Sequence, residues 1–154
     1  MLFKAQNYTM VNGVGSGSTE LNAFDNALQS ANVGNFNLIK VSSILPPGAI
    51  QRESIKENSG SVLPIAYSSI LGKNQGDSIV AVVAVGIPQD ENMVGVIMEH
   101  ASIGDPHIIE SEVMQMVCEA MRNRSIEIRE IKCSVSSCVV KDNIMCAFSG
   151  IALW

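Results

Sequence analysis

The stretch Ile79-Val80-Ala81-Val82-Val83-Ala84-Val85-Gly86-Ile87 is an almost unbroken apolar run, rich in β-branched residues. Such a run is typical of a strand that is covered on both faces, because a strand with one wet face alternates apolar and polar side chains. The sequence therefore predicts a central strand over residues 78–87, with a further layer of structure packed on each side of it.

The segments around this strand can supply those layers. Helical spacing of apolar residues and the Asp105-Pro106 start signal predict two helices, and turn residues divide the rest of the chain into strands. The expected order is a strand over 2–11, a glycine-containing loop over 12–18, a helix over 19–31 capped by Ser18, strands over 38–44, 61–71 and 93–101 with a loop over 48–60, a helix from Asp105-Pro106, and a closing hairpin of 126–140 and 144–154. Two helices shielding opposite faces of packed sheets predict an α+β sandwich.

Length and composition favour one domain over residues 1–154, because 154 residues with 47% hydrophobic content suffice for one compact core. The net charge of −5 argues against a nucleic-acid partner and suits a small cationic substrate. The chain has neither a signal-like N-terminus nor an apolar run of the ~20 residues that span a bilayer. We therefore expect a cytoplasmic protein with no membrane partner.

Cysteine and glycine patterns give little support for metal or nucleotide chemistry. The four cysteines lie in or beside apolar stretches, which predicts buried, reduced thiols. Without paired CxxC motifs, and with only two histidines, no metal site is predicted. The loop over 12–18 lacks the Lys-Ser or Lys-Thr of a phosphate loop, so it is interpreted as a tight turn into the helix.

The pair Ser42-Ser43, which ends a predicted strand and precedes Pro46-Pro47, has the chemistry for self-cleavage. The Oγ of Ser43 can attack the Ser42 carbonyl and convert the peptide to an ester; β-elimination then leaves a dehydroalanine that hydrolyses to a pyruvoyl group. The products would be chains 1–42 and 43–154. The pair is common in proteins, so an ordinary strand end is the alternative interpretation.

Three further polar residues each allow a catalytic and a structural interpretation. Glu99 ends an apolar run, where desolvation would raise the pKa of its carboxyl and keep a proton for donation, or it simply faces water. Asn37 can hydrogen-bond the oxyanion of the rearrangement, or it ends a turn. Asp25 lies at the border between helix core and solvent, or it is a solvated surface carboxylate.

Four segments occur together in one order: Ala23-Phe24-Asp25-Asn26-Ala27-Leu28, Gly34-Asn35-Phe36-Asn37-Leu38, Val41-Ser42-Ser43-Ile44-Leu45-Pro46-Pro47 and Gly95-Val96-Ile97-Met98-Glu99. With these segments and its ending, Ala152-Leu153-Trp154, the chain resembles the pyruvoyl-dependent arginine decarboxylases over nearly its whole length. The stretch from Val41 to Pro47 is the most specific part of the resemblance.

The resemblance implies cleavage between Ser42 and Ser43 and a covalent pyruvoyl cofactor derived from Ser43. It implies decarboxylation of L-arginine to agmatine and CO2 through a Schiff base, feeding polyamine synthesis, with Glu99 as the proton donor. Asn37 would assist processing or hold the site together, and Asp25 would bind the guanidinium group of the substrate. The implied fold is a four-layer αββα sandwich, assembled as a homotrimer whose active sites are shared between subunits.

The chain departs from the family pattern in some places. His100 replaces an expected aromatic residue after Glu99, and the loops over 48–60 and 72–77 differ. A histidine beside the proton donor would shift its protonation in the mildly acidic range. Two alternatives stay open at this point: decarboxylation of another amino acid, and an unprocessed, non-enzymatic trimeric binding or scaffold subunit.

Overall fold

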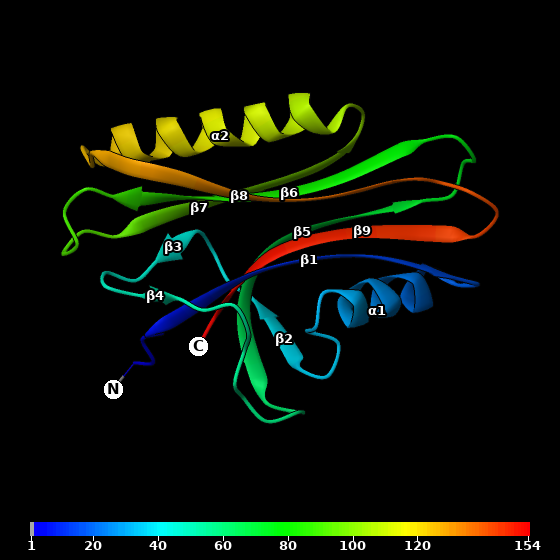
Figure 1. Cartoon of the computed structure of the whole chain (residues 1–154), viewed down its shortest axis with the longest axis horizontal. Coiled ribbons are helices and arrows are strands. Elements are labelled where there is room, and N and C mark those ends of the chain that lie inside the picture. The colour runs from blue at the N-terminus through cyan, green and yellow to red at the C-terminus, as the bar shows by residue number, and fades with distance from the viewer. Residues whose placement is uncertain (1) are drawn as a thin grey trace.

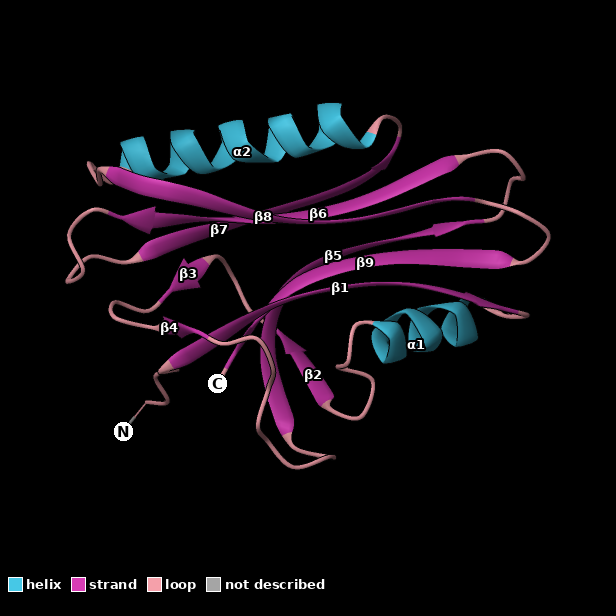
Figure 2. Cartoon of the chain, viewed as in Figure 1, coloured by secondary structure: helices cyan, strands magenta, loops and turns pink. Residues whose placement is uncertain are grey.

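Two β-sheets and two helices make up the structure, a computed structural model that describes residues 2–154 (Figures 1 and 2). The five-stranded sheet has the order β2 (Asn37–Lys40), β5 (Val62–Gly72), β9 (Ile144–Leu153), β1 (Asn7–Gly17) and β4 (Ile50–Gln51). The four-stranded sheet has the order β3 (Ile44–Leu45), β7 (Gly95–Ile103), β6 (Ser78–Pro88) and β8 (Ile128–Val139). The helices are α1 (Glu20–Ser30) and α2 (Pro106–Asn123).

The central strand is covered on both faces, as its sequence predicts. Val80 and Val82 of β6 pack under α2, whereas Val83 and Val85 face the five-stranded sheet, and all four side chains are fully buried. Helix α2 lies on the outer face of the four-stranded sheet, and α1 lies against β1 and β9 of the other sheet (Figure 1). The predicted α+β class is therefore confirmed, with the helices on opposite faces of a packed pair of sheets.

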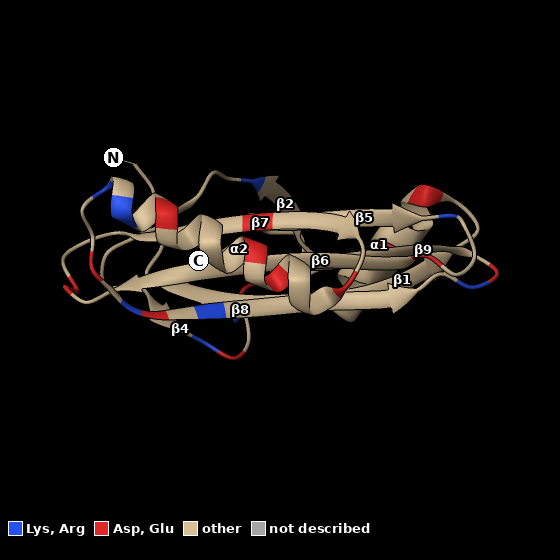
Figure 3. Ribbon diagram, turned by 90° about the horizontal axis from the view of Figure 1, so that it is seen from above, with Lys and Arg blue, Asp and Glu red and all other residues tan. Residues whose placement is uncertain are grey.

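Buried serine hydroxyls tie the two sheets together. Ser68 of β5 donates to the carbonyl oxygen of Val82 at 2.9 Å, and Ser149 of β9 donates to that of Ala81 at 2.8 Å. Because a buried hydroxyl without a partner costs stability, these bonds favour one alignment of the sheets. Charged residues lie mainly on loops and on the exposed side of α2 (Figure 3).

The first strand starts and ends later than predicted, and the glycine segment belongs to it. β1 spans Asn7–Gly17 and pairs with β9 along its whole length, so the loop expected over 12–18 is wrong. A Cβ at Gly15 would stand 2.2 Å from the backbone nitrogen of Ala27, and one at Gly13 would stand 2.4 Å from the Ala27 oxygen. These glycines permit α1 to lie directly on the strand, a contact that local sequence patterns do not reveal.

The two C-terminal strands do not form the predicted hairpin. β8 pairs with β6 in the four-stranded sheet, whereas β9 pairs with β1 and β5 in the other sheet. The turn at 141–143 therefore carries the chain from one sheet to the other. Both segments do form strands, but periodicity identifies a strand without identifying its partner.

Both predicted helices are present; α2 begins at its predicted cap, whereas the cap of α1 differs from the prediction. Asp105 caps α2 by accepting a 2.8 Å bond from the amide of His107, as expected. Helix α1 is capped by Thr19, rather than Ser18, through a 3.1 Å bond from the amide of Asn22. Leu21 is 75% exposed, and the buried face of α1 is made by Ala23, Ala27 and Leu28.

The remaining boundaries need small changes. The strands expected over 61–71, 78–87 and 93–101 are found at 62–72, 78–88 and 95–103, and the loop expected over 48–60 contains β4.

The cysteines are free thiols; Cys146 is buried and the other three are partly buried. Burial raises the pKa of the Cys146 thiol to about 11. In residues 2–154 no group of His, Cys, Asp or Glu could hold a metal ion, and no helix is long and apolar enough to cross a membrane.

Candidate active site

Ser42 and Ser43 lie where the chain leaves one sheet and joins the other. The amide of Val41 still donates to the carbonyl oxygen of Ile65 in the five-stranded sheet, at 3.1 Å. The carbonyl oxygen of Ser43 already accepts a 2.7 Å bond from the amide of Ile97 in β7 of the four-stranded sheet. The single strand predicted over 38–44 is therefore two strands, β2 and β3, because the chain changes sheets between them.

This crossing anchors both sides of the Ser42–Ser43 peptide bond independently. On the N-terminal side, β2 is held by its parallel pairing with β5, and β1 by its pairing with β9. On the C-terminal side, Ile44 and Leu45 of β3 pair with Val96 and Gly95 of β7. If this bond broke, the N-terminal segment would stay hydrogen-bonded to the five-stranded sheet. The C-terminal segment would stay hydrogen-bonded to the four-stranded sheet.

Glu99 lies in the middle of β7 rather than at the end of a strand. It stands opposite Val83 of β6, on the face of the sheet that looks toward the other sheet. Its Oε2 atom is buried and has no hydrogen-bond partner among residues 2–154. Burial raises the pKa of the Glu99 carboxyl above its ordinary value, and the nearby Lys40 ammonium partly offsets this by lowering it. Such a site favours the protonated acid.

Lys40 is a site residue that the sequence analysis did not single out. It ends β2, two residues before Ser42, and its Nζ stands 4.7 Å from the centre of the Tyr67 ring. A lysine at the end of a short strand, two residues before the serine pair, is the sequence feature that could have identified it. Its position next to Glu99 depends on the meeting of two sheets, which the sequence does not specify.

The structure brings Ser43 and Glu99 onto neighbouring strands. Ser43 faces Ile97 across the β3–β7 pair, so Glu99 is two residues farther along the same strand, and side chains two apart share a face. His100 projects to the opposite face and is exposed. The Lys40 ammonium is the charge that lowers the pKa of Glu99.

Asn37 is engaged with the 58–61 turn. Its Nδ2 donates to the carbonyl oxygen of Gly60 at 2.7 Å, and its amide donates to that of Ser61 at 2.9 Å. The side chain therefore fixes the start of β2, the strand that leads to the serine pair. A structural interpretation of Asn37, as a residue that holds the site together, fits these contacts.

Asp25 is not brought to this site within one chain. It lies on an exposed turn of α1, on the outer face of the five-stranded sheet. Within residues 2–154 no hydrogen bond or ion pair joins it to Ser43 or Glu99.

The fold and this site define an α+β protein with a serine pair and a buried acid at the meeting point of two sheets. Residues 7–149 match the sequence model of the family described as pyruvoyl-dependent arginine decarboxylase. The relatives include proteins of that name from Methanococcus vannielii, 40% identical over 99% of this chain and 93% of the relative, and Methanocaldococcus jannaschii, 37% identical over 99% and 92%. A relative from Thermococcus sibiricus is 34% identical over 89% of this chain and 87% of its own.

The chain therefore belongs to the pyruvoyl-dependent arginine decarboxylase family. The match covers the serine pair, Glu99, Asn37 and Asp25, all of which fall between residues 7 and 149. Family membership agrees with the resemblance that the sequence analysis found.

Proposed function

We propose that the protein decarboxylates L-arginine to agmatine and CO2, with a covalent pyruvoyl group derived from Ser43 as its cofactor. Membership of the family and identities of 34% to 40% to relatives named for this activity support the proposal. The observation that carries it is the buried, unpartnered Oε2 of Glu99 on the strand that binds Ser43.

The residues present fit such a cofactor. A buried polar atom without a partner is rare in a folded protein and is expected where a further group completes the site. The hydrogen bond from Ile97 holds the carbonyl of residue 43 itself, so it persists after a break on the N-terminal side. When present, a pyruvoyl group supplies a ketone that reacts with an amine and accepts electrons as CO2 leaves.

Formation of the cofactor begins with the Oγ of Ser43 attacking the carbonyl carbon of Ser42. The C–N bond between the two residues breaks, an ester forms, and its elimination releases chain 1–42 with a new carboxylate. Residue 43 then takes up water and releases ammonia. The position of this bond between two sheets supports the step, because each end keeps its own strand pairing.

Glu99 then acts as the proton donor. Decarboxylation leaves a carbon that must gain a proton, and a partly buried carboxylic acid whose pKa is raised keeps its proton to higher pH than an exposed one does. Burial raises that pKa, and the Lys40 ammonium limits the rise. Asn37 fixes the strand that leads into the site through its bond to Gly60.

Substrate recognition in this proposal requires assembly. Asp25 is exposed on α1 and would meet the guanidinium group of an arginine bound to a neighbouring copy. Leu21, one turn earlier on the same helix, is 75% exposed, as expected for a surface that another subunit covers. We further propose that the subunit is a four-layer αββα sandwich and that it assembles as a homotrimer with shared sites. We also propose a cytoplasmic location.

Intact-mass analysis of the denatured protein, treated with borohydride in the presence of arginine, tests the proposal. We expect two chains divided after residue 42, with the adduct on chain 43–154, and agmatine as the product. Glu99→Gln should be cleaved yet turn over about 10² to 10⁴ times more slowly. A single unmodified chain in folded protein would favour the scaffold alternative, and release of CO2 from another amino acid but not from arginine would favour the other substrate.

A further inference from the structure

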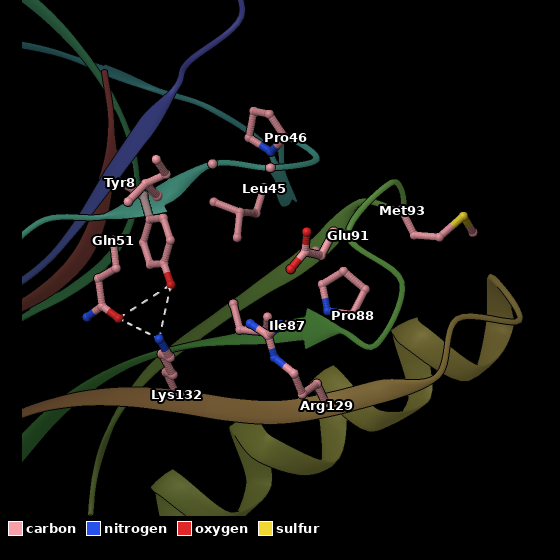
Figure 4. A pocket seen from close by; sticks show the side chains of 14 residues that line it. Tyr8, Leu45, Pro46, Gln51, Ile87, Pro88, Glu91, Met93, Arg129 and Lys132 are labelled. Atoms are coloured by element: carbon pink, nitrogen blue, oxygen red, sulfur yellow. Dashed lines mark hydrogen bonds between the residues drawn. The ribbon is translucent and has the colours of Figure 1, made fainter.

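A pocket lies beyond the far end of the β3–β7 pair (Figure 4). Its walls are the segment from Leu45 to Gln51, the end of β6 with the loop that follows, and the start of β8. Its volume is about 360 Å³, within the size range of small-ligand sites. Neither Ser43 nor Glu99 lines it, so it is separate from the site described above.

Lys132 is held in this pocket by two neutral groups and by the carboxylate of Glu130. Its Nζ donates to Oε1 of Gln51 at 2.6 Å and to the hydroxyl oxygen of Tyr8 at 3.3 Å (Figure 4). The nearest carboxylate oxygen, on Glu130, is 3.7 Å from the Nζ. The side chain of Lys132 is only 28% exposed, and its surroundings therefore fix an ammonium group in a defined place.

Two cations and one carboxylate line the pocket. Arg129 and Lys132 both come from β8 and Glu91 comes from the loop after β6; Lys132 and Glu91 lie on opposite sides, with the Arg129 side chain between them (Figure 4). Glu91 forms no ion pair with either cation in the described residues 2–154, whereas Glu130 lies 4.0 Å from Arg129. The pocket thus offers an ammonium group, that of Lys132, on one side and a carboxylate, that of Glu91, on the other (Figure 4).

Apolar side chains lie between the two charged ends. Leu45, Pro46 and Ile87 form this part of the wall (Figure 4). A plain anion would meet repulsion from Glu91, and a plain cation would meet repulsion from Lys132 and Arg129. A molecule with a carboxylate and an ammonium joined by an aliphatic segment matches all three parts of the wall.

We propose that this pocket is a binding site for a small zwitterion of the amino-acid class. The carboxylate of the ligand lies at Lys132 and Arg129, its ammonium lies at Glu91, and its carbon chain lies against Leu45 and Ile87. Because all lining residues except Tyr8 follow Ser43 in the chain, most of the site belongs to segment 43–154. The site requires no arginine and no processing of the chain.

Titration calorimetry of the wild-type protein with glycine, 4-aminobutyrate and 6-aminohexanoate tests this inference. These probes differ in the separation of their charges and carry no guanidinium group. We expect saturable binding of at least one of them, and affinities for acetate and methylammonium at least about tenfold lower. Equal binding of acetate would identify a plain anion site and overturn the assignment, as would the failure of all three zwitterions to bind.

Variants locate the bound probe. Glu91→Gln, Lys132→Gln and Arg129→Gln should each weaken binding at least about tenfold, whereas Glu112→Gln and Lys141→Gln, at exposed positions outside the pocket, should not. Circular dichroism checks that each variant folds. Glu91 and Arg129 are exposed, so their variants still provide the test if Lys132→Gln does not fold. Asp25→Ala should bind the probe normally; loss of binding there, or undiminished binding in all three pocket variants, would contradict the proposal.

Discussion

The amide of Ile97 donates a 2.7 Å hydrogen bond to the carbonyl oxygen of Ser43. This bond fixes the residue just before the two-residue edge strand β3 against β7, the strand that also carries Glu99. It lies on the C-terminal side of the Ser42–Ser43 bond, so cleavage leaves it intact. One backbone contact therefore positions residue 43 both before and after the processing that we propose.

Replacement of Ser43 tests the origin of the cofactor. Ser43→Ala removes the attacking hydroxyl, and we expect one chain of about 16.5 kDa, the mass of the whole sequence, with no decarboxylase activity. Denaturing electrophoresis and mass spectrometry provide the measurement. Ser42→Ala is the matched control and should still be cleaved, because its hydroxyl is not the nucleophile. Normal activity in an uncleaved Ser43→Ala protein would refute the mechanism.

Replacement of Glu99 should reveal the cost of burying its carboxyl. Burial raises the folded-state pKa of Glu99 above 4.5, its ordinary value, so the folded state holds this proton more tightly than the unfolded chain does. The contribution to stability is thus present below pH 4.5 and is lost as pH rises through the folded-state pKa. Glutamine does not ionise, so Glu99→Gln should gain stability relative to wild type as pH rises.

Urea unfolding at pH 4, 6 and 8 measures this difference. The advantage of Glu99→Gln over wild type should grow with pH, whereas Glu112→Gln, on the exposed side of α2, controls for the simple loss of a carboxylate. A constant or shrinking difference would mean that the acid is not penalised by burial.

Lys40 should set the pH range of the reaction. Its ammonium lowers the pKa of Glu99, so Lys40→Met should raise that pKa further. Because the protonated acid donates, turnover falls as pH rises through this pKa, and the falling limb of the kcat profile should move to higher pH. Lys40→Arg keeps the charge and should keep the limb in place. A shift toward lower pH in Lys40→Met would be the opposite of what this geometry predicts.

Asp25 tests whether the active site is shared between subunits. Asp25→Ala should be cleaved normally but should raise the KM for arginine at least about tenfold, because a charge-assisted pair is lost. Co-expression with Ser43→Ala should restore activity, since a hybrid site combines the intact Asp25 of one subunit with the cofactor of the other. If hybrids of two such variants stay inactive while each assembles normally, the shared site is ruled out.

The close contact between β1 and α1 makes a stability prediction. Gly15→Ala would place a Cβ 2.2 Å from the backbone nitrogen of Ala27, so backbone atoms must move. Overpacking of this kind costs about 1–3 kcal/mol, which thermal or urea unfolding would measure. Ser16→Ala, at the exposed neighbouring position, should change stability by no more than about 0.5 kcal/mol. Equal stability of the two variants would show that the helix does not press on this strand.

Local sequence patterns determined the kinds of element and the chemistry-bearing residues of this protein. The apolar run over 79–87 specifies a strand buried on both faces, because its lack of alternation leaves no face for water. Asp105-Pro106 starts α2 through a cap that depends only on neighbouring atoms. The serine pair and its prolines likewise form a motif within one short segment.

Only the tertiary structure decided which strands pair, where the chain changes sheets and which charges meet. Residues 38–44 form two strands because the chain crosses between sheets there, and β8 and β9 join different sheets although they are adjacent in sequence. The burial of Glu99 and the presence of Lys40 beside it follow from that crossing. These features depend on contacts between segments far apart in the chain, whereas periodicity records only which face of a segment is apolar.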